Sequence, residues 1–371
     1  MLSIMTVCGV RPELIRLSET IKKLDMYTDH CLVFTGQSYD YNLSQIFFDE
    51  LGIRKPNYTL DVKAPSIGKQ VGNILEQCET VLVKEKPDVV LVLGDTNSAL
   101  ACYVAKRLGI RVIHMEAGNR CWSSRVPEET NRKIIDHISD VNLCYTEHAR
   151  RNLLREGLHP SAIFVLGSPL PEVYNANWAA ILMSGIRKEL GLTEKGYLLA
   201  SIHREENVSD ARKLFTIIKT LGAIAKGLGV PVIFSTHPRT RQVLEKQRFV
   251  PNSNVILHEP FGMLDYVNLQ LGALCCLSDS GTIHEDSAIL GIPAVNVRDS
   301  HERPETYDAG NVVMSGTEAE NIVDAVKMVV KQAEEGARSG VKFSRPADYR
   351  DLNYSDKAVR IILSTQHGVV A

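Results

Sequence analysis

The sequence predicts an α/β protein of two doubly wound domains, each a parallel sheet covered by helices on both faces. Short apolar runs alternate with longer helical patterns along nearly all of the 371 residues. The runs are rich in β-branched residues, which is typical of parallel strands buried on both faces. A chain of this length is also too long for one small domain, so two domains of ordinary size are expected.

The first series of elements extends to about residue 168. The predicted strands of this series are residues 3–8, 31–35, 89–93, 111–115, 141–144 and 163–166. Helical patterns occupy residues 14–24, 69–84 and 97–108 between them. The segment VLGSPLPEVYN then interrupts the alternation with Gly, Ser and two prolines, which predicts a domain boundary near residue 168.

The second series repeats the alternation. Its predicted strands are residues 197–201, 232–235, 255–257, 274–277 and 294–297, with helices at 211–227 and 318–334. A last helical pattern, residues 355–363, is expected to pack back on the first domain. The predicted domains are therefore 1–168 with about 350–371, and 169–349. Two such domains facing one another would form a cleft at the carboxyl ends of their strands, where open α/β sheets bind ligands.

Composition narrows the class of protein. Apolar residues make up 44% and charged residues 23%, as in a soluble globular protein, and the net charge of −2 favours neither nucleic acid nor an anionic membrane as a partner. The N-terminal MLSIMTVCGVRPE reads as a first strand and not a signal peptide, and no run of about eighteen apolar residues occurs. The eight cysteines are scattered in apolar contexts without a C-x-x-C pair. These features predict a cytoplasmic protein with reduced core thiols, no membrane insertion and no zinc site.

Polar clusters follow three strands of the first series. Arg11 and Arg16 in GVRPELIR suit an anion at a helix N-terminus, although a solvated helix start explains them equally well. Asp95 in GDTNS could be a site carboxylate or only a helix cap. Glu116 in HMEAGNRC ends a strand beside Ala117 and Gly118, and Glu128 begins the next helix. A capping role does not explain Glu116, nor the proximity of these carboxylates that sheet order implies.

Three further clusters follow strands of the second series. His203 and Arg204 stand at a strand tip in SIHREENV, and His237 follows the next strand in STHPRTR. In SDSGTIHEDS, the segment Ser280, Gly281 and Thr282 can present N–H groups and hydroxyls to a phosphate, with Glu285 placed for a ribose diol. Arg303 in HERPE is expected on the same side. No G-x-G-x-x-G follows the first strand, and neither a Walker lysine nor H-E-x-x-H occurs, so NAD, ATP hydrolysis and zinc proteolysis fit poorly.

Together these motifs resemble the non-hydrolysing UDP-N-acetylglucosamine 2-epimerase family over nearly the whole chain. The resemblance rests on GVRPE, GDTNS, HMEAGNRC, VPEETNRKIIDH, SIHREENV, STHPRTR, SDSGTIHED and HERPE, in this order. General members of the family typically read EAGLRT, THPNP and DSGG at three of these places. This chain departs from them at Asn119, Cys121, Arg239 and Thr282 and, less distinctively, at Val10, where the family usually has Thr. EAGNRC, STHPRTR and SDSGTI…HERPE look like the branch that makes UDP-N-acetyl-L-fucosamine from UDP-2-acetamido-2,6-dideoxy-L-talose (UDP-N-acetyl-L-pneumosamine) for capsule or O-antigen.

The resemblance implies a GT-B architecture, a homodimer, and epimerisation by elimination and re-addition of UDP without a metal or redox cofactor. It implies carboxylate roles for Asp95, Glu116 and Glu128, without saying which of them acts on which face of C2. It places His203 and Arg11 at the departing diphosphate, and the remaining substrate contacts at Arg16, Arg120, Arg204, His237, Ser280, Gly281, Thr282, Glu285 and Arg303. The alternatives are a UDP-GlcNAc/UDP-ManNAc 2-epimerase and, more remotely, a GT-B glycosyltransferase.

Overall fold

The computed structural model describes residues 1–36, 41–123, 126–340 and 343–365. The chain divides into two compact units. Unit 1 comprises Met1–Ala176 and Arg350–Ala371, and unit 2 comprises Asn177–Tyr349. The division after Ala176 lies one helix beyond the boundary expected near residue 168. The expected C-terminal helix is α17 (Tyr354–Ser364), and residues 366–371 of that segment lie outside the described residues.

Unit 1 is built on a parallel sheet of seven strands in the described part of the chain, in the order β3-β2-β1-β4-β5-β6-β7. The strands are β1 (Ser3–Cys8), β2 (Asp29–Phe34), β3 (Tyr58–Thr59), β4 (Val89–Leu93), β5 (Arg111–Ala117), β6 (Val141–Cys144) and β7 (Ile163–Val165). The helices are α1 (Arg11–Tyr27), α2 (Tyr41–Glu50), α3 (Ile67–Glu85), α4 (Ala101–Arg107), α5 (Glu128–Ile138), α6 (Glu147–Arg155), α7 (Leu170–Ala176) and α17, with 3₁₀ turns η1 (Asn97–Leu100) and η2 (Pro160–Ala162).

Unit 2 repeats the plan with six described strands in the order β10-β9-β8-β11-β12-β13. The strands are β8 (Leu198–Ser201), β9 (Val232–Ser235), β10 (Val255–His258), β11 (Cys275–Ser278), β12 (Ala294–Asn296) and β13 (Val313–Met314). The helices are α8 (Trp178–Met183), α9 (Ile186–Glu189), α10 (Glu205–Val208), α11 (Ala211–Leu228), α12 (Pro238–Lys246), α13 (Met263–Gly272), α14 (Thr282–Leu290), α15 (Pro304–Asp308) and α16 (Ala319–Ser339), with the 3₁₀ turn η3 (Ala347–Tyr349).

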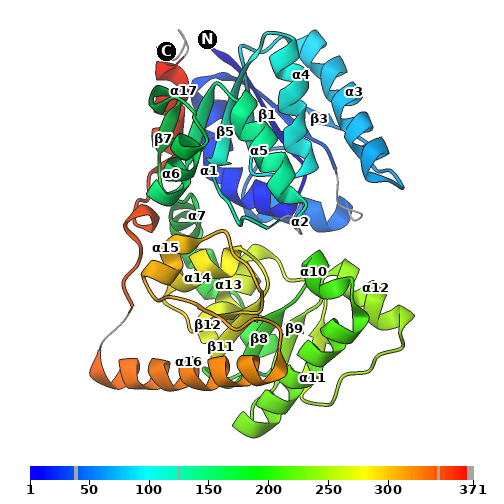
Figure 1. The fold of residues 1–371 in the computed structure, drawn as a ribbon, viewed down its shortest axis with the longest axis vertical. Coiled ribbons are helices and arrows are strands. Elements are labelled where there is room, and N and C mark those ends of the chain that lie inside the picture. Colours follow the sequence, from blue (N-terminus) through cyan, green and yellow to red (C-terminus); the bar gives the residue numbers. More distant parts are fainter. Residues whose placement is uncertain (37–40, 124–125, 341–342, 366–371) are drawn as a thin grey trace. The chain divides into compact units, whose positions relative to one another are not determined.

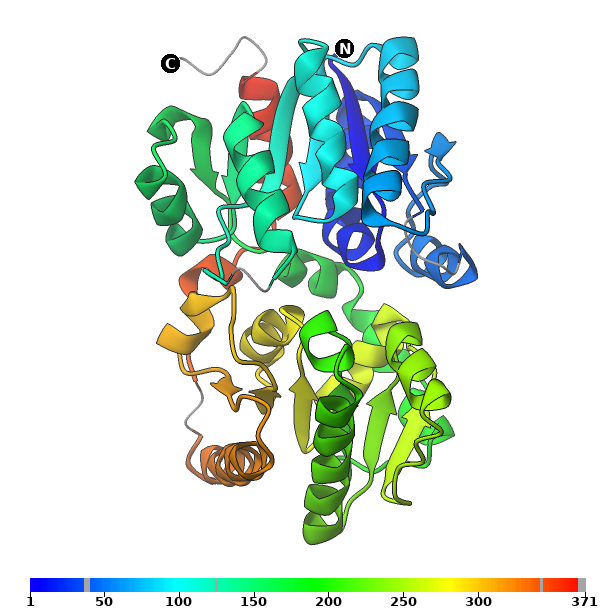
Figure 2. The same ribbon diagram turned by 45° about the vertical axis from the view of Figure 1, so that its right-hand side comes forward.

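Helices cover both faces of each sheet, as Figures 1 and 2 show, and the predicted α/β class of two doubly wound domains is confirmed. Strand β4 illustrates why helices cover both faces: its five residues, Val89–Leu93, are all apolar and buried, so the strand needs an apolar layer on each side. In unit 1, α3, α4 and α5 pack in succession on one side, while α1 contacts α7 and α17. The unit 1 core includes Val90, Val92, Val112 and Ile135, and the unit 2 core includes Leu214 and Phe234.

The C-terminal helix α17 (red in Figure 1) lies beside α1 (blue) in unit 1. Lys23 of α1 forms an ion pair of 2.9 Å with Asp356, and Ser355 donates to Glu172 of α7 through both its backbone N–H (2.7 Å) and its hydroxyl (2.6 Å). Residues more than 180 positions apart thereby complete one layer of unit 1.

In both units the strand order reverses direction at the strand that begins the unit. β1 pairs with β2 on one side and β4 on the other, and β8 pairs with β9 and β11. Ligands of doubly wound sheets bind outside the carboxyl ends of the strands at such a point. A ligand site is therefore expected at the loops after β1, β4 and β5 in unit 1 and at those after β8, β9 and β11 in unit 2.

Candidate active site

Glu116 at the tip of β5 has an unusual backbone conformation. Its φ is +65°, and the pairing of β5 with β6 shifts register between Met115 and Ala117. The left-handed region costs a residue with a side chain about 1 to 2 kcal/mol, and a bulge of this kind re-aims the side chain. The Glu116 carboxylate lies 3.8 Å from the Arg16 Nε atom and accepts a hydrogen bond of 3.2 Å from the Asn119 amide. Its Oε2 atom is also 3.8 Å from where a Cβ on Gly94 would stand, which places it against the β4 loop.

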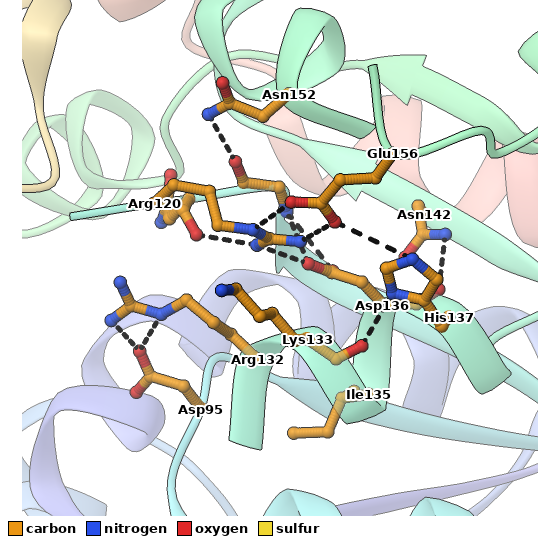
Figure 3. Close-up of polar contacts among 12 residues, drawn as sticks. Asp95, Arg120, Arg132, Lys133, Ile135, Asp136, His137, Asn142, Asn152 and Glu156 are labelled. Carbon is orange, nitrogen blue, oxygen red and sulfur yellow. Dashed lines mark hydrogen bonds and ion pairs between the residues drawn. The ribbon is translucent and has the colours of Figure 1, made fainter. Parts of the chain in front are cut away.

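Asp95 follows Gly94 in that loop and is held by α5. The Arg132 guanidinium donates to the Asp95 Oδ2 atom from Nε at 3.1 Å and from Nη2 at 2.5 Å (Figure 3). The Asn131 amide donates to the Asp95 carbonyl oxygen at 2.9 Å. The Asp95 side chain nevertheless keeps 28% of its surface exposed, so the loop presents a fixed but accessible carboxylate.

Glu128 is the first residue of the same helix, one turn before Arg132. It is partly exposed, and no described residue forms a hydrogen bond or ion pair with its carboxylate. Glu116 thus lies against Gly94, next to Asp95, and Glu128 begins the helix whose Arg132 holds Asp95. Glu129, next along, is buried and accepts from the backbone N–H of Cys121 at 3.2 Å and from Arg132 at 2.9 Å, so it anchors the loop.

A fourth carboxylate, Glu13, was not predicted from the sequence. It lies in the first turn of α1 and reaches back to accept from the N–H groups of Gly9 at 2.5 Å and Val10 at 3.2 Å, while the Thr96 hydroxyl donates to its other oxygen at 2.5 Å. Burial raises the pKa of Glu13 from 4.5 to about 7, against the lowering effect of these hydrogen bonds and with a further rise from nearby Asp95. The signal in the sequence was a Glu at the third helical position of GVRPE.

The arginines predicted in unit 1 differ in their surroundings. Arg16 is buried and lies over the Tyr145 ring at 5.6 Å, and Arg11 is partly exposed and lies 5.7 Å from the Phe47 ring centroid. Arg120 has no exposed side-chain surface, and it donates to Asp136 at 2.7 Å and to both Glu156 oxygens at 2.7 and 2.6 Å (Figure 3). A guanidinium committed to two buried or half-buried carboxylates has a structural role, so the structure corrects the expected substrate contact of Arg120.

In unit 2, a buried carboxylate holds the tip of β8. Asp279 has no exposed surface and accepts the backbone N–H groups of His203 at 3.0 Å and of Arg204 at 2.9 Å, together with the Asn207 amide at 3.1 Å. The His203 Nδ1 atom also lies 3.3 Å from Asp279 Oδ1, and the ring is 29% exposed. Asp279 therefore fixes the ring orientation of His203, a role that was not predicted from the SDSGT segment.

His237 stands beside this histidine, with ring centroids 5.5 Å apart. It is the N-cap of α12, and its Nδ1 atom accepts the backbone N–H of Arg239 at 3.2 Å. The two rings are thus held differently: the Asp279 carboxylate lies at Nδ1 of His203, and a backbone N–H donates to Nδ1 of His237.

The SDSGT turn leads into α14. The Ser280 N–H donates to the Ser278 hydroxyl at 3.0 Å, and the Thr282 N–H donates to the Ser280 hydroxyl at 3.2 Å. A side chain on Gly281 would place a Cβ 3.3 Å from a Glu302 carboxylate oxygen, so glycine leaves this turn open beside charged groups. Glu285 has no exposed surface and pairs with the buried Arg303 at 3.4 Å.

The two units offer chemically distinct groups. Unit 1 offers carboxylates that can take and give protons, and unit 2 offers histidines, an arginine and a helix N-terminus that suit a phosphate. Within the described residues, no cluster of three or more His, Cys, Asp or Glu side chains could hold a metal ion. In the same residues, no helix is long and apolar enough to cross a membrane.

The chain is similar to known proteins over most of its length. The family model described as UDP-N-acetylglucosamine 2-epimerase matches residues 22–363. A relative from Pseudomonas aeruginosa, named UDP-2,3-diacetamido-2,3-dideoxy-D-glucuronate 2-epimerase, is 35% identical over 330 residues, covering 88% of this chain and 92% of that protein.

Two solved structures are similar over nearly their whole length. The UDP-N-acetylglucosamine 2-epimerase of Rickettsia bellii is 46% identical with a TM-score of 0.90, covering 99% of this chain and 97% of that one. The UDP-GlcNAc 2-epimerase of Methanocaldococcus jannaschii, in complex with UDP-GlcNAc and UDP, is 35% identical with a TM-score of 0.89, covering 98% and 99%.

Proposed function

Because the chain belongs to the UDP-N-acetylglucosamine 2-epimerase family and is therefore an isomerase of UDP-sugars, we propose that it inverts C2 of a UDP-linked N-acetylhexosamine through a glycal. The observation that supports this chemistry most directly is that Glu116, aimed by a strained backbone, lies against the loop of Asp95, while Glu128 begins the helix that holds Asp95.

The reaction needs these groups because C2 of a sugar nucleotide has no adjacent carbonyl to acidify its proton. The C1–O bond to UDP breaks first, and its electrons leave with the diphosphate while positive charge develops at C1 and the ring oxygen. A carboxylate then takes the C2 proton, and the C–H electrons form the C1–C2 double bond of the glycal. Return of a proton to the opposite face of C2 and attack of UDP at C1 complete the inversion.

The contacts of the three carboxylates suggest a different role in the reaction for Asp95 than for Glu116 and Glu128. Asp95, ion-paired with Arg132, is placed to stabilise the positive charge that develops on the ring. Glu116 and Glu128 come from different elements, β5 and α5, and act on C2 as the two proton-transfer groups.

The departing diphosphate is stabilised by cationic and N–H donors. His203 and Arg11 bind its oxygens, with Arg16, Arg204, His237 and Arg303 in support, and Ser280, Gly281 and Thr282 bind phosphate at the start of α14. Glu285, oriented by Arg303, binds the ribose hydroxyls. The reaction is redox-neutral, so it consumes no oxidant or reductant.

For the substrate we propose UDP-2-acetamido-2,6-dideoxy-L-talose, converted to UDP-N-acetyl-L-fucosamine for a capsule or O-antigen. The support is Asn119, Cys121, Arg239 and Thr282, which depart from the general family pattern. Asn119 contacts the Glu116 carboxylate at 3.2 Å, and Cys121 donates to the neighbouring buried Glu129 at 3.3 Å. The second candidate is UDP-GlcNAc, the sugar nucleotide in the M. jannaschii complex.

One experiment tests both the chemistry and the substrate. The protein is incubated in D₂O with each UDP-sugar in parallel, and the products are analysed by NMR. We expect deuterium at C2 of a product that stays nucleotide-linked, with faster turnover of the 6-deoxy-L-sugar. Retention of the original C2 hydrogen would refute the elimination scheme, and exclusive use of UDP-GlcNAc would refute the substrate assignment. Turnover only with a sugar acceptor would instead identify a glycosyltransferase.

Glu116→Gln tests the site itself. The variant should lose on the order of 10²-fold or more in C2 exchange while it retains UDP binding, because a proton-transfer group acts in the transition state. Glu147→Gln, on the exposed surface of α6, is the matched control. Full exchange in Glu116→Gln would remove Glu116 from the mechanism.

The remaining proposals follow from the family resemblance and the scattered thiols. We propose a cytoplasmic homodimer whose partners are its UDP-sugar and UDP. Light scattering of the purified protein measures the oligomeric state, and a mass of one chain would refute the dimer.

A further inference from the structure

The Gly118 peptide, just beyond Glu116, is held from both sides. Its N–H donates to the Asp136 carboxylate of α5 at 3.2 and 3.3 Å, and its carbonyl accepts from the Asn152 amide of α6 at 3.0 Å. Figure 3 shows the Asp136 and Asn152 side chains reaching this stretch of chain from different sides. A side chain at Gly118 would place a Cβ 2.4 Å from the Ala149 carbonyl oxygen, so only glycine allows this close approach.

Asp136 also holds the chain on the other side of Glu116. It has no exposed surface, and its Oδ1 atom lies 2.8 Å from Nδ1 of buried His114, while Oδ2 accepts from Arg120 at 2.7 Å. The chain on each side of Glu116 is therefore tied to a single carboxylate on α5, through the His114 ring before it and the Gly118 N–H after it. Burial acts to raise the pKa of Asp136, but the bonds from His114 and Arg120 outweigh it, and the pKa lies below its ordinary value.

The second nitrogen of His114 extends this network to Asp95. Nε2 lies 2.8 Å from the carbonyl oxygen of Gly94, the residue that precedes Asp95. Both ring nitrogens of His114 therefore lie within hydrogen-bond distance of an oxygen, one from Asp136 and one from Gly94. Arg120 and Glu156 extend the buried group further, because Arg120 pairs with both Asp136 and Glu156.

This network maintains the strained backbone conformation of Glu116. A left-handed residue with a side chain persists only where its surroundings over-determine it. Bonds at His114 and Gly118, on either side of Glu116, do so here. Without them the chain would relax toward ordinary extended backbone, and the carboxylate would turn away from the β4 loop.

Asp140 makes a similar contact to the same strand, so it allows a purely stabilising contact to be compared with those of Asp136. Asp140, just after α5, accepts the backbone N–H of Val112 at 2.8 Å and pairs with Lys106. It therefore ties the start of β5 to the end of α5, much as Asp136 ties the end of the strand to the same helix. Its attachment point precedes both His114 and Glu116, so only the Asp136 contacts flank Glu116.

We propose that Asp136, acting with His114 and Asn152, is a positioning residue that holds Glu116 and Asp95 in register for proton transfer at C2. This inference rests on the proposed function, because it assigns the network to the geometry of those two carboxylates. Asp136 itself does not touch the substrate.

The test compares Asp136→Asn with Asp140→Asn. Asparagine is isosteric with aspartate, but at position 136 it cannot accept from Gly118, His114 and Arg120 together. Turnover is measured with the UDP-sugar that the wild type converts, UDP affinity by calorimetry, and stability by urea unfolding. We expect Asp136→Asn to lose about 10²-fold in kcat, the loss that a misplacement of about 1 Å produces, with unchanged UDP affinity. Asp140→Asn should keep its kcat even where it loses stability.

Asn152→Ala provides a second measurement in case Asp136→Asn does not fold. Asn152 is only half-buried, and the substitution frees the Gly118 carbonyl without leaving a buried charge. We expect a lower kcat at unchanged UDP affinity. A wild-type kcat in Asn152→Ala, or equal losses of kcat in Asp136→Asn and Asp140→Asn, would overturn the inference. Absence of C2 exchange in the wild type would refute the proposed function instead, so the two failures are distinguishable.

Discussion

Glu13→Gln should make the protein's stability less dependent on pH between about 4.5 and about 7. The Glu13 carboxyl is buried and its pKa is raised from 4.5 to about 7, so between these values the folded protein holds a proton that the unfolded chain releases. Stability falls with rising pH wherever the folded state binds more protons. The contribution of Glu13 is therefore fully present below the unfolded pKa and is lost as pH rises through the folded one.

The size of the effect follows from the shift. A change from 4.5 to about 7 corresponds to about 3 kcal/mol at about 1.4 kcal/mol for each pKa unit. Glutamine keeps the shape of the side chain. Its carbonyl oxygen can accept from Gly9 and Val10, and its NH₂ can donate to the Thr96 hydroxyl, so the variant removes the titration with little loss of contact.

Urea unfolding from about pH 4 to about pH 8 measures the difference. The wild type should lose about 3 kcal/mol relative to Glu13→Gln across this window. Glu19→Gln is the control, because Glu19 lies on the same helix and pairs with Lys22 at 2.7 Å near the surface. Parallel curves for the wild type and Glu13→Gln would show that Glu13 titrates alike in both states and would refute the reasoning.

Three other substitutions separate binding from structure. Asp279→Asn should weaken UDP binding about 10-fold or more in calorimetry, because Asn cannot accept hydrogen bonds from the His203, Arg204 and Asn207 donors together. An unchanged UDP affinity would contradict the role given to His203. His237→Asn keeps a good N-cap for α12 but loses the imidazole ring, so UDP affinity should fall about 10-fold while the melting temperature stays constant. An unchanged UDP affinity would show that His237 serves only as the helix cap. Arg120→Lys should cost about 2 kcal/mol in urea unfolding, because Lys cannot bridge Asp136 and both Glu156 oxygens, and an unchanged midpoint would refute that structural assignment.

Most of the fold could be predicted because the buried strands carry a strong composition signal. β4 and β9 begin and end where the predicted apolar runs do, since each residue of such a strand is buried on one face or the other. The edge strands β3 and β13 were not predicted, because two residues each are too few to form a pattern. Pairing with a neighbouring strand, which no local sequence shows, creates them.

For the candidate site, the places of the carboxylates in the fold could be predicted from the sequence, but the contacts that individual side chains make could not. Asp95, Glu116 and Glu128 follow strands or begin a helix, and parallel strand order brings such ends together. The family resemblance placed Arg120 among the substrate contacts, but its partners Asp136 and Glu156 come from later in the chain. Asp136 and Asp279 look like ordinary helix and turn residues until the structure shows the N–H groups that they accept.

Unit 1 is assembled from two separated stretches of chain, and this affects how it is made in the cell. On the ribosome, α1 and α7 are synthesised early, but α17, which supplies Asp356 and Ser355 to them, follows only after residues 177–349. At ~5–20 residues per second, that interval is roughly 10 to 35 s. During it the nascent first unit has its sheet but an uncovered helical layer, so its completion waits until α17 has emerged from the ribosome. Unit 2 is continuous and can finish folding first, although it is synthesised later.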